Sequence, residues 1–214
     1  TMEFSTDPNS TFYKQALEVK VTGDNLTPWQ QDTARYWVDT PGQTGAPAGH
    51  WMMIVSQVVD QLDLSLEMAS MSYGLVGISL GDAFISAWYV KYQDNLLRPV
   101  TYIQRYIDPE WESFIESPGF PEYPSGHSVA SAAAATVLTE MFGTTAFVDN
   151  SVRKHGLEPR AYPSFMAAAS EAAISRLYGG IHYRQAIELG ITHGECVGNN
   201  VINYVLLRSV PQGE

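Results

Sequence analysis

Apolar residues recur at helical spacing along most of the chain, and the alternation typical of strands is scarce. Thr27 followed by Pro28 predicts an N-cap with proline at the first helical position, and an amphipathic helix continues through Trp29, Ala34 and Trp37. Further helices are expected at about 49–62, 63–97, 99–107, 128–139, 164–175 and 182–204. The pattern therefore predicts an all-α fold, a helical bundle without an internal repeat.

Three stretches of this pattern carry more specific expectations. Asp63 is expected to cap the long helix that has Lys91 and Arg98 near its end. The run of residues 128–139 is rich in alanine and contains neither Gly nor Pro, which indicates a buried helix. Residues 142–163 contain Gly and Pro with mixed charge and are too many for a simple turn, so we expect either a flap over a functional site or a surface excursion.

Length and composition indicate one globular domain, residues 1–214, in which residues 1–48 carry no recognisable motif: the chain has 214 residues and 45% hydrophobic content. The net charge of −11 argues against nucleic acid or an anionic membrane as a partner. Residues 68–90 are long enough to cross a membrane, but they include Asp82, four serines and three glycines. We expect a core helix of the bundle there and no membrane insertion.

The stretch Phe120-Pro-Glu-Tyr-Pro-Ser-Gly-His127 lies between a Pro/Gly-containing loop and the alanine-rich helix. It therefore delivers Ser125, Gly126 and His127 to a helix N-terminus, where free backbone N–H groups and the helix dipole favour anions. An oxyanion could be held there by the Gly126 amide and the Ser125 hydroxyl. The alternative is an ordinary loop with a capping serine.

Two further stretches place cations at regular spacings. Lys91 and Arg98 are seven positions apart, about two helical turns, so both are expected on one helix face that ends just before Pro99. Arg176 is followed six positions later by His182 across a Gly-Gly turn. Each pair alone is compatible with a solvated face or a hydrogen-bonded histidine. Together they would form a positive pocket in a negative protein.

In this order the three stretches resemble the signature shared by type 2 phosphatidic acid phosphatases, bacterial acid phosphatases and vanadium-dependent haloperoxidases. That signature is Lys-x6-Arg-Pro, then Pro-Ser-Gly-His, then Ser-Arg-x5-His-x3-Asp. Here 24 residues separate Pro99 from Pro124 and 47 separate His127 from Ser175. The resemblance covers about residues 49–198. The Asp expected four positions after the last histidine is Ala186.

Residues 82–91 and the Phe-Pro-x-Tyr sequence that precedes Ser-Gly-His are more similar to the haloperoxidase branch. The resemblance implies a vanadate cofactor, with phosphate able to occupy the same site. It implies His182 as the vanadium ligand, or as the nucleophile in a phosphatase, and His127 as the general acid/base. It also implies Trp88 and Phe120 as pocket residues on the halide side, where the alternative is core packing. The residues that would bind the oxygens are Lys91, Arg98, Ser125, Gly126 and Arg176.

Three functions are compatible with this signature. The first is a vanadate-dependent haloperoxidase that oxidises halide with hydrogen peroxide. The second is a metal-free acid phosphatase that acts on phosphomonoesters through a phosphohistidine at His182. Ala186 argues against it, because the missing Asp would hold that histidine in its nucleophilic tautomer. The third is a non-catalytic phosphate- or vanadate-binding relic.

The remaining expectations concern partners and place in the cell. The first two functions imply small-molecule substrates, and the sequence does not indicate an oligomeric state. No signal peptide opens the chain, whose polar start indicates a trimmed beginning, whereas the family suggests a periplasmic or secreted protein. His50 is expected to be a surface or capping histidine.

Overall fold

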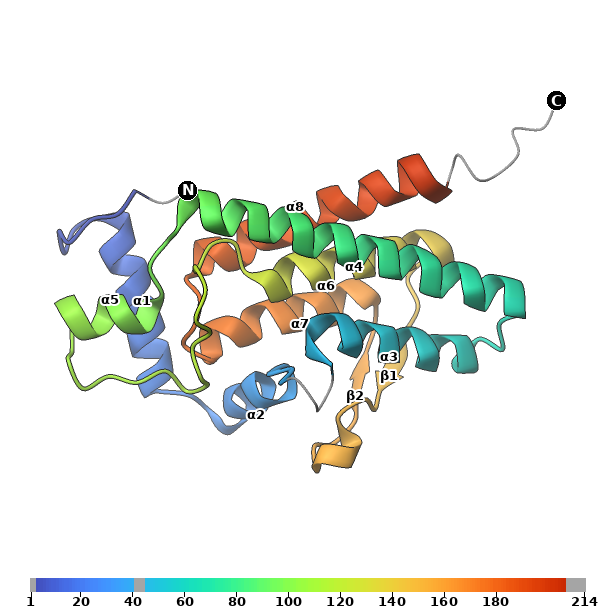
Figure 1. Ribbon diagram of the computed structural model, residues 1–214. Coiled ribbons are helices and arrows are strands. Elements are labelled where there is room, and N and C mark those ends of the chain that lie inside the picture. The colour runs from blue at the N-terminus through green and yellow to red at the C-terminus, as the bar shows by residue number, and fades with distance from the viewer. Residues whose placement is uncertain (1–2, 41–44, 207–214) are drawn as a thin grey trace.

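The structure is a computed structural model that describes residues 3–40 and 45–206, and helices make up most of it (Figure 1). The α-helices are, in chain order, α1 (Thr11–Asp24), α2 (Pro28–Tyr36), α3 (Ala46–Gln61), α4 (Leu66–Asp94), α5 (Pro99–Tyr106), α6 (Gly126–Phe142), α7 (Phe165–Tyr178) and α8 (Arg184–Val201). Between α6 and α7 the chain forms a small sheet of β1 (Phe147–Asp149) and β2 (Arg160–Tyr162), and a π-helical turn (Ile202–Leu206) follows α8. The prediction of an all-α bundle is confirmed.

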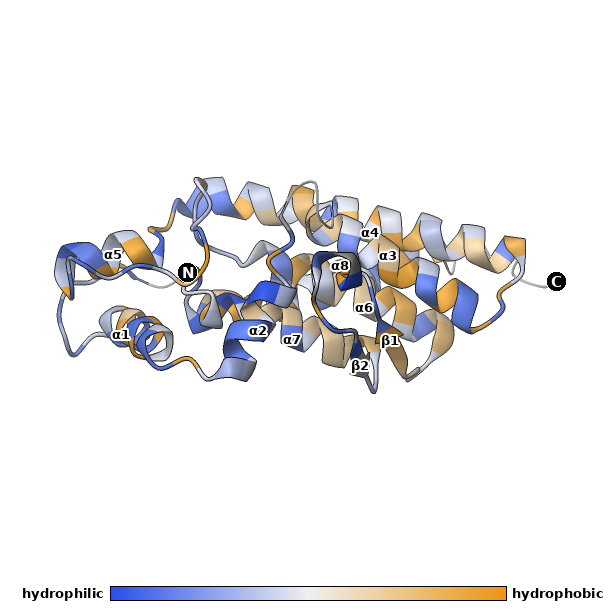
Figure 2. Ribbon diagram, turned by 90° about the horizontal axis from the view of Figure 1, so that it is seen from below, coloured by the Kyte–Doolittle hydropathy of each residue, from blue (hydrophilic) through white to orange (hydrophobic). Residues whose placement is uncertain are grey.

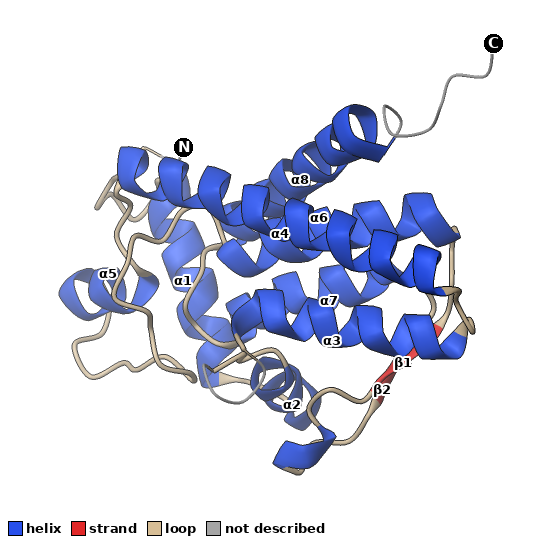
Figure 3. Cartoon of the chain, turned by 45° about the vertical axis from the view of Figure 1, so that its right-hand side comes forward, coloured by secondary structure: helices blue, strands red, loops and turns tan. Residues whose placement is uncertain are grey.

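Helix α6 is the centre of the bundle, because α3, α4, α7 and α8 all pack against it (Figure 3). Residues 128–135 are buried on every side, as their alanine-rich sequence predicted. Facing them, α8 carries Gly190, Gly194 and Gly198, and a Cβ atom on Gly194 would overlap the Val129 carbonyl oxygen. These glycines let α8 approach α6 closely, which fixes how the starts of the two helices face each other.

Helices α1 and α5 cover one end of the bundle through an aromatic cluster. The Phe12 ring lies between Tyr102 of α5 and Tyr183 at the start of α8, with ring centroids 5.0 and 5.2 Å away. The apolar residues of α6 and α7 lie in the middle of the molecule, where Figure 2 colours these helices largely tan and orange. Because Tyr183 follows His182 directly, the aromatic cluster also holds the segment that carries this histidine.

Lys91 and Arg98 do not share a helix, so the prediction of one common helix face is wrong. Helix α4 ends at Asp94, and Asn95 adopts the left-handed conformation with φ 51° and ψ 39°. Arg98 is extended, with φ −67° and ψ 149°, and is the N-cap of α5. The physical reason is Pro99, whose ring disfavours helical geometry in the residue before it.

Helix α4 begins at Leu66 with Ser65 as its N-cap, since the Ser65 side chain accepts from the Met68 amide, so the prediction that Asp63 caps it is wrong. The helix buries one face against the bundle and exposes Ile85 and Tyr89 on the other, so it is not a fully enclosed core helix. Within the described residues, one continuous segment that begins at Leu66 is long and apolar enough to span a membrane, and 33% of its most apolar window is buried.

The segment between α6 and α7 folds back as a hairpin in which Phe147 pairs with Tyr162 and Asp149 with Arg160. Its strand β1 packs on α3, and Phe147 and Tyr162 enter the main core. Asp149 is fully buried. Neither alternative for residues 142–163 describes the strands: the described residues that line the cavity below come from other segments, so the hairpin is not a flap over it, and the buried strand residues make the hairpin part of the core and not a surface excursion.

Candidate functional site

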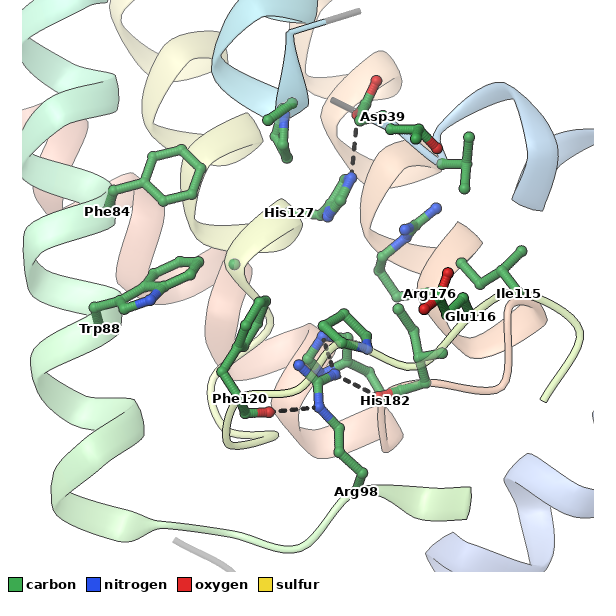
Figure 4. Close-up of a pocket in the computed structure, with 17 residues that line it drawn as sticks. Asp39, Phe84, Trp88, Arg98, Ile115, Glu116, Phe120, His127, Arg176 and His182 are labelled. Carbon is green, nitrogen blue, oxygen red and sulfur yellow. Dashed lines mark hydrogen bonds and ion pairs between the residues drawn. The ribbon is translucent and has the colours of Figure 1, made fainter. Parts of the chain in front are cut away.

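A cavity of about 410 Å³ opens at the end of the bundle where α4 and α7 end and α6 and α8 begin (Figure 4). Of the residues singled out by the sequence motifs, seven line it: Trp88, Arg98, Phe120, Gly126, His127, Arg176 and His182. Lys91 and Ser125 are buried just behind the wall. The three motifs, which lie far apart in the chain, therefore meet around one space.

Lys91 is fully buried and binds the loop before α6. Its Nζ atom donates to the carbonyl oxygens of Pro121, Glu122 and Pro124 at 3.0, 2.9 and 2.5 Å. An ammonium group has three hydrogens, so these contacts use all of them. Burial, and to a lesser degree the charge of Arg98, lowers the pKa of Lys91 to about 7. Lys91 thus holds the shape of the loop and places its charge behind the cavity.

Arg98 connects this loop with the segment before α8. Its Nε donates to the Phe120 carbonyl at 2.9 Å, and its Nη1 donates to the Ile181 carbonyl at 2.8 Å. The same Nη1 lies 3.2 Å from His182 Nε2. Its Nη2 is buried and has no hydrogen-bond partner within the described part of the chain. A buried guanidinium donor without a partner is costly, and it marks where an anion would be bound.

His182 lies in the turn before α8, where Tyr183 is the N-cap, so the prediction that His182 opens the last helix is wrong by two positions. Its Nδ1 lies 2.7 Å from Glu122 Oε1, which also accepts from the Tyr183 amide at 3.0 Å. Since Arg98 can only donate, His182 Nε2 is the acceptor and Nδ1 carries the hydrogen. Burial, followed by the charge of Arg98, lowers the pKa of His182 well below its usual value. The ring is therefore neutral, with the Nε2 lone pair directed to Arg98 and the cavity.

Glu122 is a functional residue that the sequence motifs missed. It is fully buried, and burial raises its pKa to about 8 although the Tyr183 amide, Arg98 and Lys91 oppose the shift. It supplies the carboxyl group beside His182 that was expected from position 186. Ala186 is itself buried, and its carbonyl accepts from the Ser125 amide at 3.1 Å. The one available signal was an acidic residue inside an otherwise apolar and proline-rich loop.

Arg176 forms another part of the cavity wall, and in Figure 4 it lies beside His127. Its Nε donates to the Ser175 hydroxyl at 2.9 Å, and its Nη2 donates to the Trp37 and Ala34 carbonyls. These contacts hold the guanidinium against the C-terminal end of α2. A second fixed positive charge is thereby placed on the cavity.

His127 lies in the first turn of α6 with 15% of its side chain exposed. Its Nε2 is 3.1 Å from Asp39 Oδ2, while burial and then the charge of Arg176 lower its pKa to about 4. The neutral ring therefore donates from Nε2 to the carboxylate, which leaves the Nδ1 lone pair free for proton transfer. Ser125 caps α6 by accepting from the Ser128 amide at 3.3 Å. A Cβ atom on Gly126 would lie 3.2 Å from the Trp88 ring, so glycine permits this close approach.

Asp39 has a second contact, with His50, whose Nδ1 lies 2.7 Å from Asp39 Oδ1. His50 is fully buried, so the prediction of a surface or capping histidine is wrong. The other ring nitrogen is 2.8 Å from Asp149 Oδ2. The sequence motifs included none of these three residues, because they lie on segments that only the fold brings together.

Comparison with known proteins gives a consistent result. Residues 71–208 match the family described as the VCPO second helical-bundle domain. A solved bacterial vanadium-dependent iodoperoxidase has 40% sequence identity and a TM-score of 0.91, over 95% of this chain and 52% of that one. Two structures of bacterial vanadium-dependent chloroperoxidase, holo-type and apo-type, share the fold with 18% and 19% identity and TM-scores of 0.72 and 0.71. Each covers 91% of this chain, and the chain covers 47% and 49% of them.

No curated protein matched the chain. The chain spans about half the length of the solved structures that it matches. The family model nevertheless covers well over half of the chain, and it includes all three motifs completely and most of the long helix that carries Lys91. The chain therefore belongs to the vanadium-dependent haloperoxidase family, in the part described as the second helical-bundle domain.

Proposed function

We propose that the chain provides the vanadate site of a haloperoxidase that oxidises halide with hydrogen peroxide. One observation carries this proposal: the unpartnered Arg98 Nη2 donor and the His182 Nε2 lone pair occur together on one buried cavity. A tetrahedral oxyanion would accept from Arg98 Nη2, and its central atom could take His182 Nε2 as a ligand in place of the 3.2 Å contact with Arg98 Nη1. The 40% identity to a bacterial vanadium-dependent iodoperoxidase supports it and makes iodide the first halide to assay.

The residues present fit vanadate. His182 Nε2 would be the vanadium ligand, with Glu122 holding its ring from the other side. Arg98 and Arg176 would bind oxygens from the cavity wall, and the Gly126 amide and Ser125 hydroxyl would bind them from the start of α6. Lys91 would add its charge from behind the loop whose shape it holds. Bound vanadate supplies the Lewis acid that activates hydrogen peroxide toward halide.

His127 would be the general acid/base of the reaction. The lone pair on His127 Nδ1 would accept a proton from hydrogen peroxide when it enters the site. The same nitrogen would then return this proton to the peroxide oxygen that leaves as water or hydroxide. The contact between Nε2 and Asp39 keeps this lone pair on the nitrogen that does not face the carboxylate. A pKa of about 4 keeps the ring unprotonated at neutral pH, so that its lone pair is not already occupied by a proton.

The apolar side of the cavity would receive the halide. Phe84, Trp88 and Phe120 line it, and the Trp88 ring lies with its centroid 5.1 Å from each of the other two rings. Such a wall removes water from a weakly hydrated anion, while Arg98 lies 5.0 Å from the Phe120 centroid and supplies positive charge.

A phosphomonoesterase acting through phospho-His182 is a second candidate, and one observation favours it. Glu122 orients the imidazole in the tautomer that a nucleophile needs, so Ala186 is no longer an argument against it. Phosphate would bind to the same arginines. A binding relic remains the third candidate and differs from both by having no turnover.

The test compares the wild type with His182→Ala, and His155→Ala is the matched control because His155 is exposed on the hairpin. Each protein is loaded with vanadate, dialysed and analysed for vanadium, and then assayed for iodide oxidation by hydrogen peroxide. We expect the wild type and the control to retain vanadium and oxidise iodide, and His182→Ala to lose both. The vanadate-free wild type is assayed on a phosphomonoester in parallel. Phosphate release without iodide oxidation would select the phosphatase, and vanadium retention without either activity would select the relic.

A further inference from the structure

A continuous line of buried hydrogen bonds runs from the cavity into the body of the protein. It passes from His127 Nε2 to Asp39 Oδ2 at 3.1 Å, from Asp39 Oδ1 to His50 Nδ1 at 2.7 Å, and from His50 Nε2 to Asp149 Oδ2 at 2.8 Å. The four residues come from α6, the segment after α2, α3 and β1. Asp39, His50 and Asp149 are all buried, with relative exposures of 4%, 0% and 0%.

The far end of this line is firmly held. Asp149 Oδ1 accepts from the amide and hydroxyl of Ser151 at 2.9 and 2.5 Å, and its Oδ2 accepts from the Tyr36 hydroxyl at 2.8 Å. Gln57 donates to Oδ1 at 3.3 Å. A carboxylate with so many donors stays ionised when buried. Hydrogen bonds from Ser151 and His50 outweigh burial and lower the pKa of Asp149 to about 2.

His50 is fixed in orientation as well as in position. Its ring stacks on Trp37 with centroids 4.4 Å apart and an interplanar angle of 24°. It bridges two carboxylates, which overcome the effect of burial and raise its pKa to about 9. Both ring nitrogens therefore donate, and each carboxylate receives one N–H. A buried imidazolium bound in this way would hold Asp39 both in place and in its charged form.

We propose that His50 and Asp149 are positioning residues for His127, which act through Asp39 to fix the orientation of the His127 ring. Asp39 lies between two imidazoles and offers one oxygen to each. If His50 anchors Oδ1, then Oδ2 stays directed at His127 Nε2 and the Nδ1 lone pair stays available to the cavity. The effect of His50 on turnover rests on the proposed function of His127 as general acid/base. The orientation of the His127 ring does not depend on that proposal.

Two substitutions of His50 distinguish its hydrogen bond to Asp39 from its hydrogen bond to Asp149. In His50→Asn the side-chain amide nitrogen lies near the former Nδ1 and can still donate to Asp39. In His50→Gln it lies near the former Nε2 and can donate to Asp149 instead. The readout is the hydrogen on His127 Nε2, observed by ¹⁵N-edited proton NMR in vanadate-free protein, together with its exchange rate with water. His155→Gln is the control, because His155 is an exposed histidine between the two strands.

We expect this hydrogen to be visible and slowly exchanging in the wild type and in the control. In His50→Asn, which keeps the contact with Asp39 and loses the one with Asp149, it should exchange only slightly faster. In His50→Gln it should exchange about tenfold faster, the factor that corresponds to one lost hydrogen bond. Unchanged exchange in folded His50→Gln overturns the proposal, and so does equal acceleration in both His50 variants. If neither variant folds, Asp149→Asn is measured instead, with faster exchange expected and an unchanged rate overturning the proposal.

The same proteins separate this inference from the proposed function. If the wild type does not oxidise iodide but the His127 resonance depends on His50, the positioning proposal stands and the haloperoxidase proposal fails. If the wild type oxidises iodide and the resonance does not depend on His50, the reverse holds. When both proposals are correct, iodide turnover should fall more in His50→Gln than in His50→Asn while vanadium retention stays the same, because neither variant touches His182.

Discussion

Two imidazoles face the cavity, and the side-chain oxygen of an acidic residue behind each one determines which ring nitrogen keeps its lone pair. Glu122 accepts from His182 Nδ1, which leaves Nε2 as the ligand atom. Asp39 accepts from His127 Nε2, which leaves Nδ1 for proton transfer. The two acidic side chains thus assign opposite nitrogens to two rings of the same chemistry. This difference is why we assign a ligand role to one histidine and an acid/base role to the other.

The role of Glu122 can be tested by Glu122→Gln. Above about pH 8, where Glu122 is ionised despite its raised pKa, the amide oxygen can still accept from the imidazole but the negative charge of the side chain is lost, so Nε2 becomes less basic and the titration is done in this pH range. We expect vanadate affinity to fall by about 10–100-fold, the usual effect of removing a partner of a ligating histidine. Isothermal titration with orthovanadate gives the affinity. Glu116→Gln is the matched control, since Glu116 lines the cavity but is exposed; an equal loss in both variants would show that overall cavity charge, and not the contact with His182, sets the affinity.

At the scale of elements, the site depends on how closely α8 packs against α6. The glycines of α8 lie on the small residues of α6, and the Ser125 amide at the start of α6 donates to the Ala186 carbonyl on α8. Lys91 adds a second connection between elements, because it joins the end of α4 to the loop before α6. A shift of α8 would therefore move His182 relative to the Ser125 cap.

Substitution of Gly194 by alanine tests this packing. The new Cβ would overlap the Val129 carbonyl oxygen and lie 2.8 Å from the Ala132 Cβ, so the helices must separate. We expect destabilisation of about 1–3 kcal/mol, even after the gain of about 1 kcal/mol in helix propensity. Gly81→Ala on α4 is the control, because nothing lies within 4 Å of its Cβ. Urea unfolding should show that Gly81→Ala is slightly more stable than the wild type. If Gly194→Ala is also more stable than the wild type, this account of the α6–α8 contact is wrong.

At the scale of the whole molecule, a chain of net charge −11 concentrates cations around one buried cavity. Lys91 and Arg98 are held there by backbone carbonyls of the protein itself, three of which accept from Lys91. The line of buried groups from Asp39 to Asp149 ties α3, the segment after α2 and the hairpin together. Its protonation state should therefore affect the stability of the entire fold.

The pH dependence of unfolding follows from the sign of the His50 shift. The folded pKa, about 9, lies above the unfolded value of 6.5, so His50 stabilises fully below about pH 6.5 and its contribution is lost as pH rises through about 9. The free energy of unfolding of the wild type minus that of His50→Gln should thus decrease over this window, by on the order of 3 kcal/mol. Urea unfolding between pH 6 and 10 measures it. A difference that stays constant across the window would show that His50 is neutral in the folded protein.

The sequence by itself determined the motif residues that meet at the cavity and the helical class of the fold. The motifs are local strings, and helical periodicity, the Thr27 cap and the alanine-rich α6 depend on neighbours within a few positions. The break between Lys91 and Arg98 could also have been predicted from Pro99, although the seven-residue spacing suggested a continuous helix.

Only the tertiary structure decided which groups orient the two histidines. Glu122 is 60 positions from His182, and Asp39 is 88 positions from His127. Asp149 reaches His50 across 99 positions. No periodicity or local propensity relates residues at such separations, because their contacts arise from helix packing and from the hairpin between α6 and α7. A buried carboxylate is stable only where the packed fold supplies its donors, so its role becomes apparent only once those donors are in place.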